Sequence, residues 1–445
     1  MPQPPHSKSG KSKPADTSAL GARLGAFEVL RQVLYKRRSL DDAFGVTPAF
    51  ADLLGADRGY AAFIVRTCLK RLGQIDALII HCMPDPLPRK ARPVYDVLRV
   101  GIAQLLFSVT AEHAAVSTTV DLCRAVGQEP FAKLTNAVMR RLQREGIALV
   151  AAQDAARLNT PDWLWQSWSD AYGNETAAAI AEAHMATPPI DLTVKSDSAG
   201  WAEKLGGQII LDGTVRLLEA DDVTTLPGFN DGAWWVQDTA ARLAVSLLGN
   251  VNGKRVYDLC AAPGGKTLEL LNAGAVVTAL DISERRMQRV RENLERTGLS
   301  AELVVEDAKT WQPDQLADIV LLDAPCSSTG TLRRHPDVAH LKTPDDIAKL
   351  AVVQGDLLDT AAKLVTPGGI LLYVTCSLQP EEGPRAVRKF LTRNTRFTRT
   401  PVTAKDLAGL PEAINADGDL RTLPCLLAEQ GGMDGFFAAR LQRQS

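Results

Sequence analysis

The feature that most constrains the fold is a regular alternation of strand-like and helix-like patterns that begins near residue 232. Short apolar runs predict buried strands, and amphipathic segments between them predict helices. Such alternation is typical of a doubly wound α/β fold with a mostly parallel sheet, in which ligands bind at the carboxyl ends of the strands. The predicted strands lie within residues 255–261, 275–283, 301–308, 317–325 and 369–377.

A chain of 445 residues is too long for a single core, and its upstream part follows different patterns. Apolar residues at helical spacing predict an all-α domain over residues 18–150, including one continuous helix over residues 59–79. Residues 151–231 mix helical and short strand patterns and predict a small α+β connector before the α/β domain, residues 232–445. Residues 1–17 predict a disordered basic tail.

Composition narrows the class of protein. There is no uncharged apolar run of the length that a membrane span needs, so we expect no contact with a membrane. The seven cysteines are widely spaced and form no C-x-x-C pair, which argues against a disulfide framework and against a zinc site. We therefore expect a cytoplasmic protein without a metal, and a monomer.

Charge is divided unevenly along the chain. Residues 1–150 contain 21 Lys and Arg against 13 Asp and Glu, a net charge of +8, and the remainder contains 29 against 39. This asymmetry indicates that the N-terminal part contacts a polyanion, although a solvated helical surface has the same signature.

The turn after the first α/β strand, "DLCAAPGGKT" at residues 258–267, has the glycines of a ligand-binding turn followed by a helix. A P-loop would need glycine five residues before Gly265, where the chain has Cys260, and the dinucleotide fingerprint G-x-G-x-x-G is also missing. The turn therefore favours a small adenosine-like ligand without a triphosphate.

Acidic residues end three successive strands, at Asp258, Asp281 and Asp307. A carboxylate at the position of Asp281 can accept hydrogen bonds from both ribose hydroxyls, and Asp307 is placed to meet an adenine edge. Each acid alone could equally be a helix cap. Together with the glycine turn, the three indicate a nucleoside cofactor.

Two cysteines, Cys326 and Cys376, follow strands of the same predicted sheet, so we expect both to face one crevice. Asp323 adds a carboxyl group to that crevice. Hydroxyl residues flank both cysteines, which argues against a packed apolar interior. A redox dithiol is an alternative, and it would require the two sulfur atoms within bonding distance.

Two thiols and one acid beside a methyl-donor pocket fit methylation at C5 of a pyrimidine. A thiolate adds to C6 and makes C5 nucleophilic, while an acid stabilises charge at N3. A base then removes the C5 proton, and the thiol leaves.

The motifs "DLCAAPGGKT", "DAPCSSTGTLRRHPD", "YVTCSLQPEE" and "GGMDGFFAARL" resemble those of the RNA 5-methylcytosine methyltransferases, in particular the bacterial ribosomal RNA small-subunit methyltransferase B (Sun/Fmu) family. The N-terminal helices, including "NAVMRRL", are similar to the NusB-like RNA-binding domain of that family. The resemblance implies a Rossmann-like class I fold, S-adenosylmethionine as methyl donor and small-subunit ribosomal RNA as substrate.

The same resemblance implies residue roles. Cys376 is the nucleophile, Cys326 assists product release, and Lys266 lines the catalytic pocket beside Asp323. The implied cofactor contacts are Asp258, Cys260, Ala261, Ala262, Pro263, Gly264, Gly265, Lys266, Asp281, Asp307 and Asp323.

RNA recognition is expected to combine the basic N-terminal domain with phosphate contacts from Arg333, Arg334 and His335. The target base must leave its stack to reach both cysteines. The alternatives are the same chemistry on transfer RNA, a non-catalytic RNA-binding or assembly factor, and a thiol redox enzyme.

Overall fold

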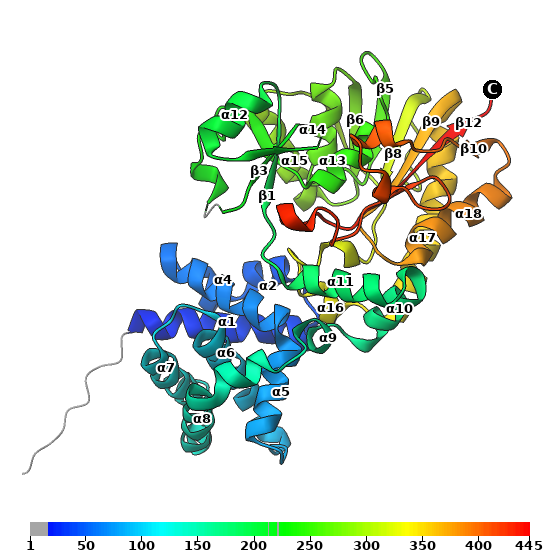
Figure 1. Cartoon of the computed structure of the whole chain (residues 1–445). Helices are drawn as coiled ribbons and strands as arrows, with labels where there is room; N and C mark the ends of the chain where they lie inside the picture. Colours follow the sequence, from blue (N-terminus) through cyan, green and yellow to red (C-terminus); the bar gives the residue numbers. More distant parts are fainter. Residues whose placement is uncertain (1–16, 212, 220–221) are drawn as a thin grey trace, which may run out of the picture. The chain divides into compact units, whose positions relative to one another are not determined.

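The computed structural model describes residues 17–211, 213–219 and 222–445, which form two compact units, one ending at Asn159 and one beginning at Thr160 (Figure 1). The predicted basic tail lies outside the described residues, except for Thr17, which begins the first helix. Across the described ranges, no helix has both the length and the apolar character needed to span a bilayer. The boundaries proposed at residues 150/151 and 231/232 remain predictions.

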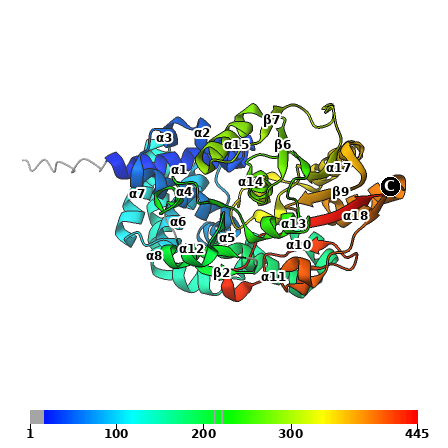
Figure 2. The same ribbon diagram turned by 90° about the horizontal axis from the view of Figure 1, so that it is seen from above.

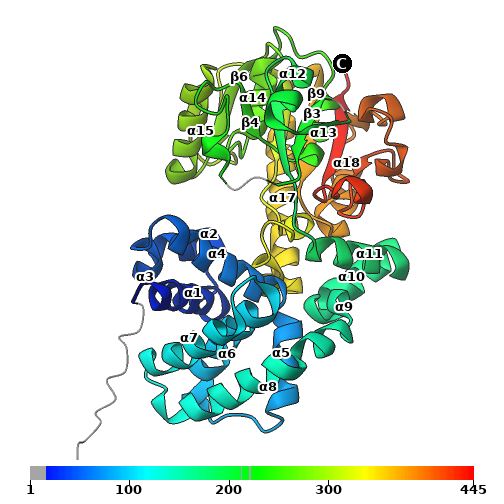
Figure 3. The same ribbon diagram turned by 60° about the vertical axis from the view of Figure 1, so that its left-hand side comes forward.

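The first unit is built from helices, which are blue to green in Figure 3. Helices α1, α4 and α6 bury Leu30, Ile64 and Val97 completely, because the apolar positions recur at helical spacing. Asp96 in α6 is also fully buried, and its carboxylate accepts a hydrogen bond from Arg31 of α1 at 2.7 Å. The helices are α1 Thr17–Lys36, α2 Leu40–Val46, α3 Pro48–Ala51, α4 Gly55–Lys70, α5 Leu72–Cys82, α6 Arg92–Phe107, α7 Glu112–Ala125, α8 Ala132–Ala151 and α9 Ala155–Asn159.

The continuous helix predicted over residues 59–79 is wrong, because the chain breaks at Arg71 (φ −114°, ψ 24°) between α4 and α5. The start of α5 is held by a tertiary contact, since the amide of Gln74 donates to the side chain of Asn159 at 3.0 Å. A Cβ at Gly73 would lie 1.8 Å from the carbonyl oxygen of Leu158. The close approach of α9 therefore fixes the break, and local helix propensity does not reveal it.

The second unit begins with two helices and a small antiparallel sheet in the order β2-β3-β1-β4. Trp168 of α10 is fully buried and packs against His184 of α11 at a ring distance of 5.4 Å. A buried ion pair between Arg216 and Asp191 joins β3 to β1 at 2.7 Å. The elements are α10 Asp162–Tyr172, α11 Asn174–Met185, β1 Ile190–Val194, α12 Ser198–Leu205, β2 Gln208–Ile210, β3 Thr214–Leu217 and β4 Trp234–Val236.

The large sheet has the order β10-β12-β9-β8-β5-β6-β7, with β11 paired to β12. Figure 2 labels three of its strands, with β6 and β7 side by side and β9 farther along the sheet. The strands from β9 to β7 are parallel to one another. At one side of the sheet β12 runs antiparallel to β9, and β10 runs antiparallel to β12. This arrangement confirms the predicted doubly wound, mostly parallel fold. The strands are β5 Arg255–Leu259, β6 Val276–Asp281, β7 Glu302–Val305, β8 Ala317–Asp323, β9 Val365–Thr375, β10 Phe397–Arg399, β11 Leu420–Arg421 and β12 Phe437–Arg443.

Alternate residues of β8 supply the two faces of this sheet. Ile319 and Leu321 pack with α13 and α14, whereas Val320 and Leu322 pack with α17 and α18. Helix α17 starts sharply because Thr343 and Asp346 form a capping box. The helices are α13 Thr239–Ser246, α14 Gly265–Asn272, α15 Glu284–Thr297, α16 Val338–Leu341, α17 Pro344–Leu364 and α18 Pro384–Arg393. With both faces covered, the carboxyl ends of the parallel strands are the edge left for a ligand.

Candidate active site at the carboxyl ends of the parallel strands

A cavity of about 670 Å³ opens at the carboxyl ends of β5, β6, β7, β8 and β9. Carboxylates and thiols share its wall with apolar side chains, among them Leu280, Ile282 and Leu357. The sequence-predicted residues that line it are Cys260, Ala262, Pro263, Asp281, Asp307, Asp323, Cys326, His335 and Cys376. The predicted site residues outside this lining are Asp258, Ala261, Gly264, Gly265, Lys266, Arg333 and Arg334.

The turn after β5 forms one wall of the cavity. Cys260 adopts a left-handed conformation (φ 63°), and Gly264, with φ 102°, is the N-cap residue just before α14. The amide of Ala261 donates to the carbonyl oxygen of Leu280 at 2.9 Å, so the turn bends toward β6. A non-glycine residue held at positive φ is uncommon and often marks a functional turn.

Asp258 lies beneath this turn and not in the cavity wall. Its Oδ2 atom accepts a hydrogen bond from the Thr267 hydroxyl at 2.6 Å, while its buried Oδ1 atom has no hydrogen-bond partner in the structure. Burial raises the pKa of Asp258 to about 7, and the Thr267 hydroxyl opposes the shift. The unsatisfied oxygen is a hydrogen-bonding position that a ligand or a water could fill.

Asp281 and Asp307 lie in the cavity at the ends of β6 and β7. Asp281 accepts hydrogen bonds from the amides of Ala262 at 3.3 Å and Ser283 at 2.9 Å, and Asp307 accepts one from the amide of Lys309 at 3.0 Å. Each acid therefore both orders a turn and faces the cavity. Two carboxylates on a wall that also carries apolar side chains fit the hydroxyls and the base of a nucleoside cofactor.

Cys326 and Cys376 approach each other across the turns that follow β8 and β9, with their sulfur atoms 3.5 Å apart. The parallel register pairs Asp323 with Val374, which brings the two strand ends level. The amide of Gly330 then donates to the carbonyl oxygen of Cys376 at 3.0 Å and ties the two turns together. Both cysteines are free thiols and are partly exposed.

The two thiols have different electrostatic surroundings. The hydrogen bond from Cys326 lowers the pKa of Cys376, helped by the Ser328 hydroxyl at 3.5 Å and by the charge of Lys266. The same hydrogen bond and burial hold the pKa of Cys326 well above the ordinary value of a thiol. Of the two sulfur atoms, Cys376 is therefore the one that loses its proton more readily.

Lys266 and Asp323 form a partly buried ion pair next to the thiols, with Nζ and Oδ2 at 2.7 Å. Burial acts to lower the pKa of Lys266, but the Asp323 carboxylate outweighs it and raises the pKa above its ordinary value. The Lys266 ammonium also lies 5.2 Å from the centre of the Phe436 ring. The lysine is thus held charged and fixed beside the cavity.

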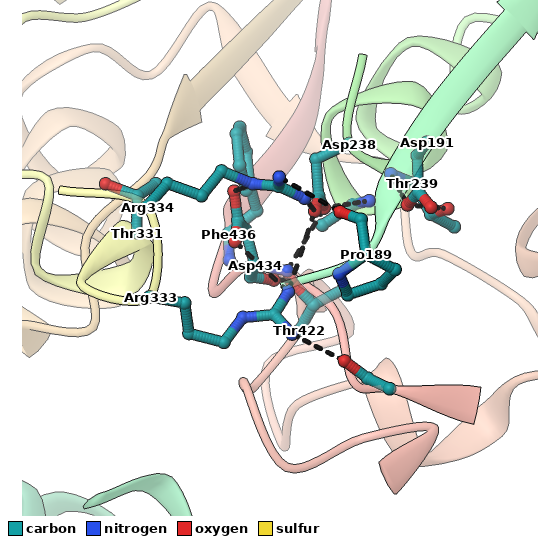
Figure 4. Close-up of polar contacts among 12 residues, drawn as sticks. Pro189, Asp191, Asp238, Thr239, Thr331, Arg333, Arg334, Thr422, Asp434 and Phe436 are labelled. Atoms are coloured by element: carbon teal, nitrogen blue, oxygen red, sulfur yellow. Dashed lines mark hydrogen bonds and ion pairs between the residues drawn. The ribbon is translucent and has the colours of Figure 1, made fainter. Parts of the chain in front are cut away.

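Arg333 and Arg334, which the sequence predicts as phosphate contacts, are both engaged in ion pairs within the protein (Figure 4). Arg333 is 2% exposed and donates to the carboxylate of Asp434 at 3.2 Å. Arg334 joins the carboxylates of Asp434 and Asp238, at 3.1 and 2.8 Å. These carboxylates already hold both guanidinium groups inside the second unit, which argues against the predicted phosphate contacts from this pair. Of the three residues predicted for RNA, His335 is exposed and lines the cavity.

The hydroxyl residues beside the cysteines also have an unexpected position, since Ser327, Thr375 and Ser377 are fully buried. They do not mark an exposed turn; they donate hydrogen bonds to the side chain or main chain of the buried Glu382. The sequence analysis did not identify Glu382 as a site residue. Its position six residues after Cys376, within "TCSLQPEE", was the signal that could have placed it near that cysteine. Within the described ranges, no group of three or more His, Cys, Asp and Glu side chains is arranged to hold a metal ion.

Two family models match the chain, "16S rRNA methyltransferase RsmB/F" over residues 245–442 and the NusB family over residues 21–144. The ribosomal RNA small subunit methyltransferase B of Pseudomonas putida is 38% identical over 444 residues, covering 95% of this chain and 98% of the relative. The chain belongs to this methyltransferase family. The Cronobacter sakazakii protein of the same name is 36% identical and covers 90% of this chain and 97% of its own length.

Solved structures agree on the fold. The crystal structure of PH0851 superposes with a TM-score of 0.75 and 24% identity, covering 97% of this chain and all of that one. The structure of NSun6 from Pyrococcus horikoshii with SFG gives a TM-score of 0.55 and 20% identity, covering 64% of this chain and 98% of that one. Membership of the methyltransferase B family confirms the predicted family, its Rossmann-like and NusB-like parts and its dependence on S-adenosylmethionine.

Proposed function

We propose that this methyltransferase modifies C5 of a cytosine in small-subunit ribosomal RNA through a covalent bond between Cys376 and C6 of the base. The observation that carries the proposal is the thiol pair, with sulfur atoms 3.5 Å apart and opposite pKa shifts. A cytosine needs a nucleophile at C6 before C5 can react, and a thiolate with a lowered pKa beside a fixed cation supplies one.

The cofactor is assigned to the part of the cavity formed by Cys260, Ala262, Asp281 and Asp307. Asp281 is expected to accept hydrogen bonds from the ribose hydroxyls and Asp307 to meet the adenine edge, while the aliphatic wall packs on the base. When bound there, S-adenosylmethionine supplies the methyl group. Asp258, Ala261, Gly264 and Gly265 shape the turn under it.

In the first step the thiolate of Cys376 adds to C6 of the flipped-out base, and the electron pair moves toward N3. The Lys266 ammonium is assigned to stabilise the negative charge that develops there, and Asp323, paired with it at 2.7 Å, is assigned to hold the lysine in place. Because both groups are held by burial and by each other, their dipole is in place before the base arrives. The Phe436 ring over Lys266 limits water at this position.

In the last step a base removes the C5 proton and the bond between Cys376 and C6 breaks. Cys326 is assigned to this stage. Its pKa is raised first by the hydrogen bond to Cys376 and also by the charge on that sulfur. Both effects are lost once Cys376 is bound to carbon, so the pKa of Cys326 falls. Cys326 then gives up its proton to water and, as a thiolate, accepts the proton that leaves C5 while the bond between Cys376 and C6 breaks.

The test uses small-subunit ribosomal RNA, S-adenosylmethionine and four proteins, namely wild type, Cys326→Ala, Cys376→Ala and the control Cys425→Ala. We expect Cys326→Ala to accumulate a protein–RNA adduct on a denaturing gel, and Cys376→Ala to give neither adduct nor 5-methylcytosine. The control, which lies outside the cavity lining, is expected to methylate like wild type. A reversed pattern would exchange the two cysteine roles.

Transfer RNA is run in parallel as a competing substrate, because related chemistry on that RNA would give the same adduct. Methylation of transfer RNA alone would overturn the substrate, and no methylation of either RNA would favour a non-catalytic assembly factor. A ribosomal RNA substrate also fits the predicted cytoplasmic location. The protein is predicted to act as a monomer and to bind the RNA through the N-terminal helices.

A further inference from the structure

Glu382 is a fully buried acid that the mechanism above does not use. It ends the short turn Pro380–Glu382, six residues after Cys376, and none of its surface is exposed. Its main-chain carbonyl accepts hydrogen bonds from the hydroxyls of Tyr373 at 2.8 Å and Thr375 at 3.3 Å, so the turn is anchored to β9. The position of the carboxylate is therefore set by the strand that carries Cys376.

The carboxylate of Glu382 binds both cysteine turns at once. One oxygen accepts from the amide of Ser327 at 2.9 Å and from the side chain of Gln354 at 3.0 Å. The other oxygen accepts from the hydroxyls of Ser327 and Ser377, which lie 3.0 Å from each other. Since Ser327 follows Cys326 and Ser377 follows Cys376, one side chain joins the two residues next to the thiols.

All of these side-chain partners are neutral groups. A buried carboxylate that is bound by neutral groups costs more to keep than a neutral side chain of the same shape, unless its hydrogen bonds are needed. The guanidinium of Arg421, next to Gly383, donates instead to the carbonyl oxygen of Ser377. The charge also acts on the thiols, because Glu382 adds to the effects of the Cys376 hydrogen bond and burial that raise the pKa of Cys326. Both the hydrogen bonds of the Glu382 carboxylate and its negative charge therefore act at the cysteine pair.

We propose that Glu382 is a positioning residue that clamps the turns of Cys326 and Cys376, so that the two thiols are held facing each other at contact distance. The inference rests on the proposed function only for the catalytic roles assigned to the two thiols. The clamp itself is a property of the protein without RNA or cofactor, and it can be measured there.

The experiment measures the rate at which diamide closes a disulfide between Cys326 and Cys376, because this rate depends on how the two thiols are placed. The two thiols form one S–S bond and give up two hydrogen atoms, which reduce the diazene to a hydrazine. Closure is followed in the full-length protein by peptide mass spectrometry. We expect Glu382→Gln and Glu382→Asp to close roughly ten- to a hundredfold more slowly than wild type, because displacement of reacting groups by about an ångström has an effect of that size.

Alkylation by iodoacetamide as a function of pH gives the second readout. In Glu382→Gln the negative charge near Cys326 is lost, so the alkylation profile of Cys326 is expected to move to lower pH. In Glu382→Asp the charge is kept, so its profile is expected to stay nearer to wild type. A purely structural role would not separate these two variants. The matched control is Glu381→Gln, since Glu381 is partly exposed and pairs with Arg385, and it is expected to behave as wild type in both assays.

Folding is checked by circular dichroism and thermal unfolding. If Glu382→Gln folds and retains both the closure rate and the pH profile of wild type, the proposal is wrong. If it does not fold, Ser327→Ala and Ser377→Ala decide, and wild-type closure rates in both would overturn the clamp. Because neither assay contains RNA or S-adenosylmethionine, a failure to methylate ribosomal RNA would disprove the proposed function and leave this result intact.

Discussion

The amide of Gly435 donates a hydrogen bond to the carbonyl oxygen of Gly330 at 2.8 Å, so the loop before β12 lies directly on the turn that carries Cys326. A Cβ at Gly330 would lie 1.9 Å from the carbonyl oxygen of Gly435. The two glycines are thus required by space, and the contact joins a late part of the chain to the turn that carries Cys326.

Replacing Gly330 with alanine should force these two segments apart. We expect Gly330→Ala to lower the free energy of unfolding by about 1–3 kcal/mol, as for other overpacked sites, and to lower the methylation rate by displacing Cys326. Urea unfolding and an rRNA methylation assay measure the two effects. In the control, Gly355→Ala within α17, the new methyl group meets only the tip of Arg393 at 3.4 Å, so stability should rise by up to about 1 kcal/mol. Equal effects in both variants would contradict the steric argument.

The ion-pair cluster of Arg333, Arg334, Asp238 and Asp434 provides a second prediction (Figure 4). Asp434→Asn leaves two buried guanidinium groups with one carboxylate, and we expect a loss of about 3 kcal/mol in urea unfolding. The exposed pair Arg393–Asp359 is the comparison, because Asp359→Asn should cost less than about 1 kcal/mol. Similar losses in the free energy of unfolding for both variants would show that the cluster does not stabilise the fold more than an exposed ion pair does.

Stability should depend on pH through Asp258. Its pKa of about 7 in the folded protein lies above the ordinary value of 3.8, so the folded state holds the proton more tightly than the unfolded state. This contribution to stability is fully present below about pH 4 and is lost as the pH rises to 7, by up to about 4 kcal/mol. Asp258→Asn removes the titration. Unfolding free energies measured from pH 4 to pH 8 should therefore fall more steeply for wild type than for the variant, and parallel curves would refute the shift.

Cofactor binding tests the role proposed for Asp281. Asp281→Asn weakens the hydrogen bonds to the ribose hydroxyls, and we expect S-adenosylhomocysteine to bind roughly tenfold more weakly in isothermal titration calorimetry. Glu284→Gln is the control at the start of α15, where Glu284 is exposed and pairs with Arg291, and its affinity should match wild type. Unchanged affinity in Asp281→Asn would remove Asp281 from the cofactor site.

The alternation of strands and helices was sufficient to predict the parallel sheet and the edge at which Cys326, Cys376, Asp281 and Asp307 meet. This worked because the ends of parallel strands converge whatever their loops do. The roles of Arg334 and Glu382 were not predictable in the same way. Arg334 is neutralised by Asp434, 100 residues later, and Glu382 is explained by hydroxyls on two separate turns. Such pairings depend on tertiary contacts that local patterns do not contain.

The place of β12 in the large sheet has a consequence for synthesis of the protein. This strand, residues 437–443, lies between β9 and β10, and Phe436 just before it covers Lys266. During synthesis on the ribosome, the main-chain groups on one edge of β9 therefore stay unpaired until some sixty further residues have emerged. A nascent chain stalled in that interval would display an apolar strand and an unfinished catalytic pocket, which makes this the stage at which a chaperone would be most needed.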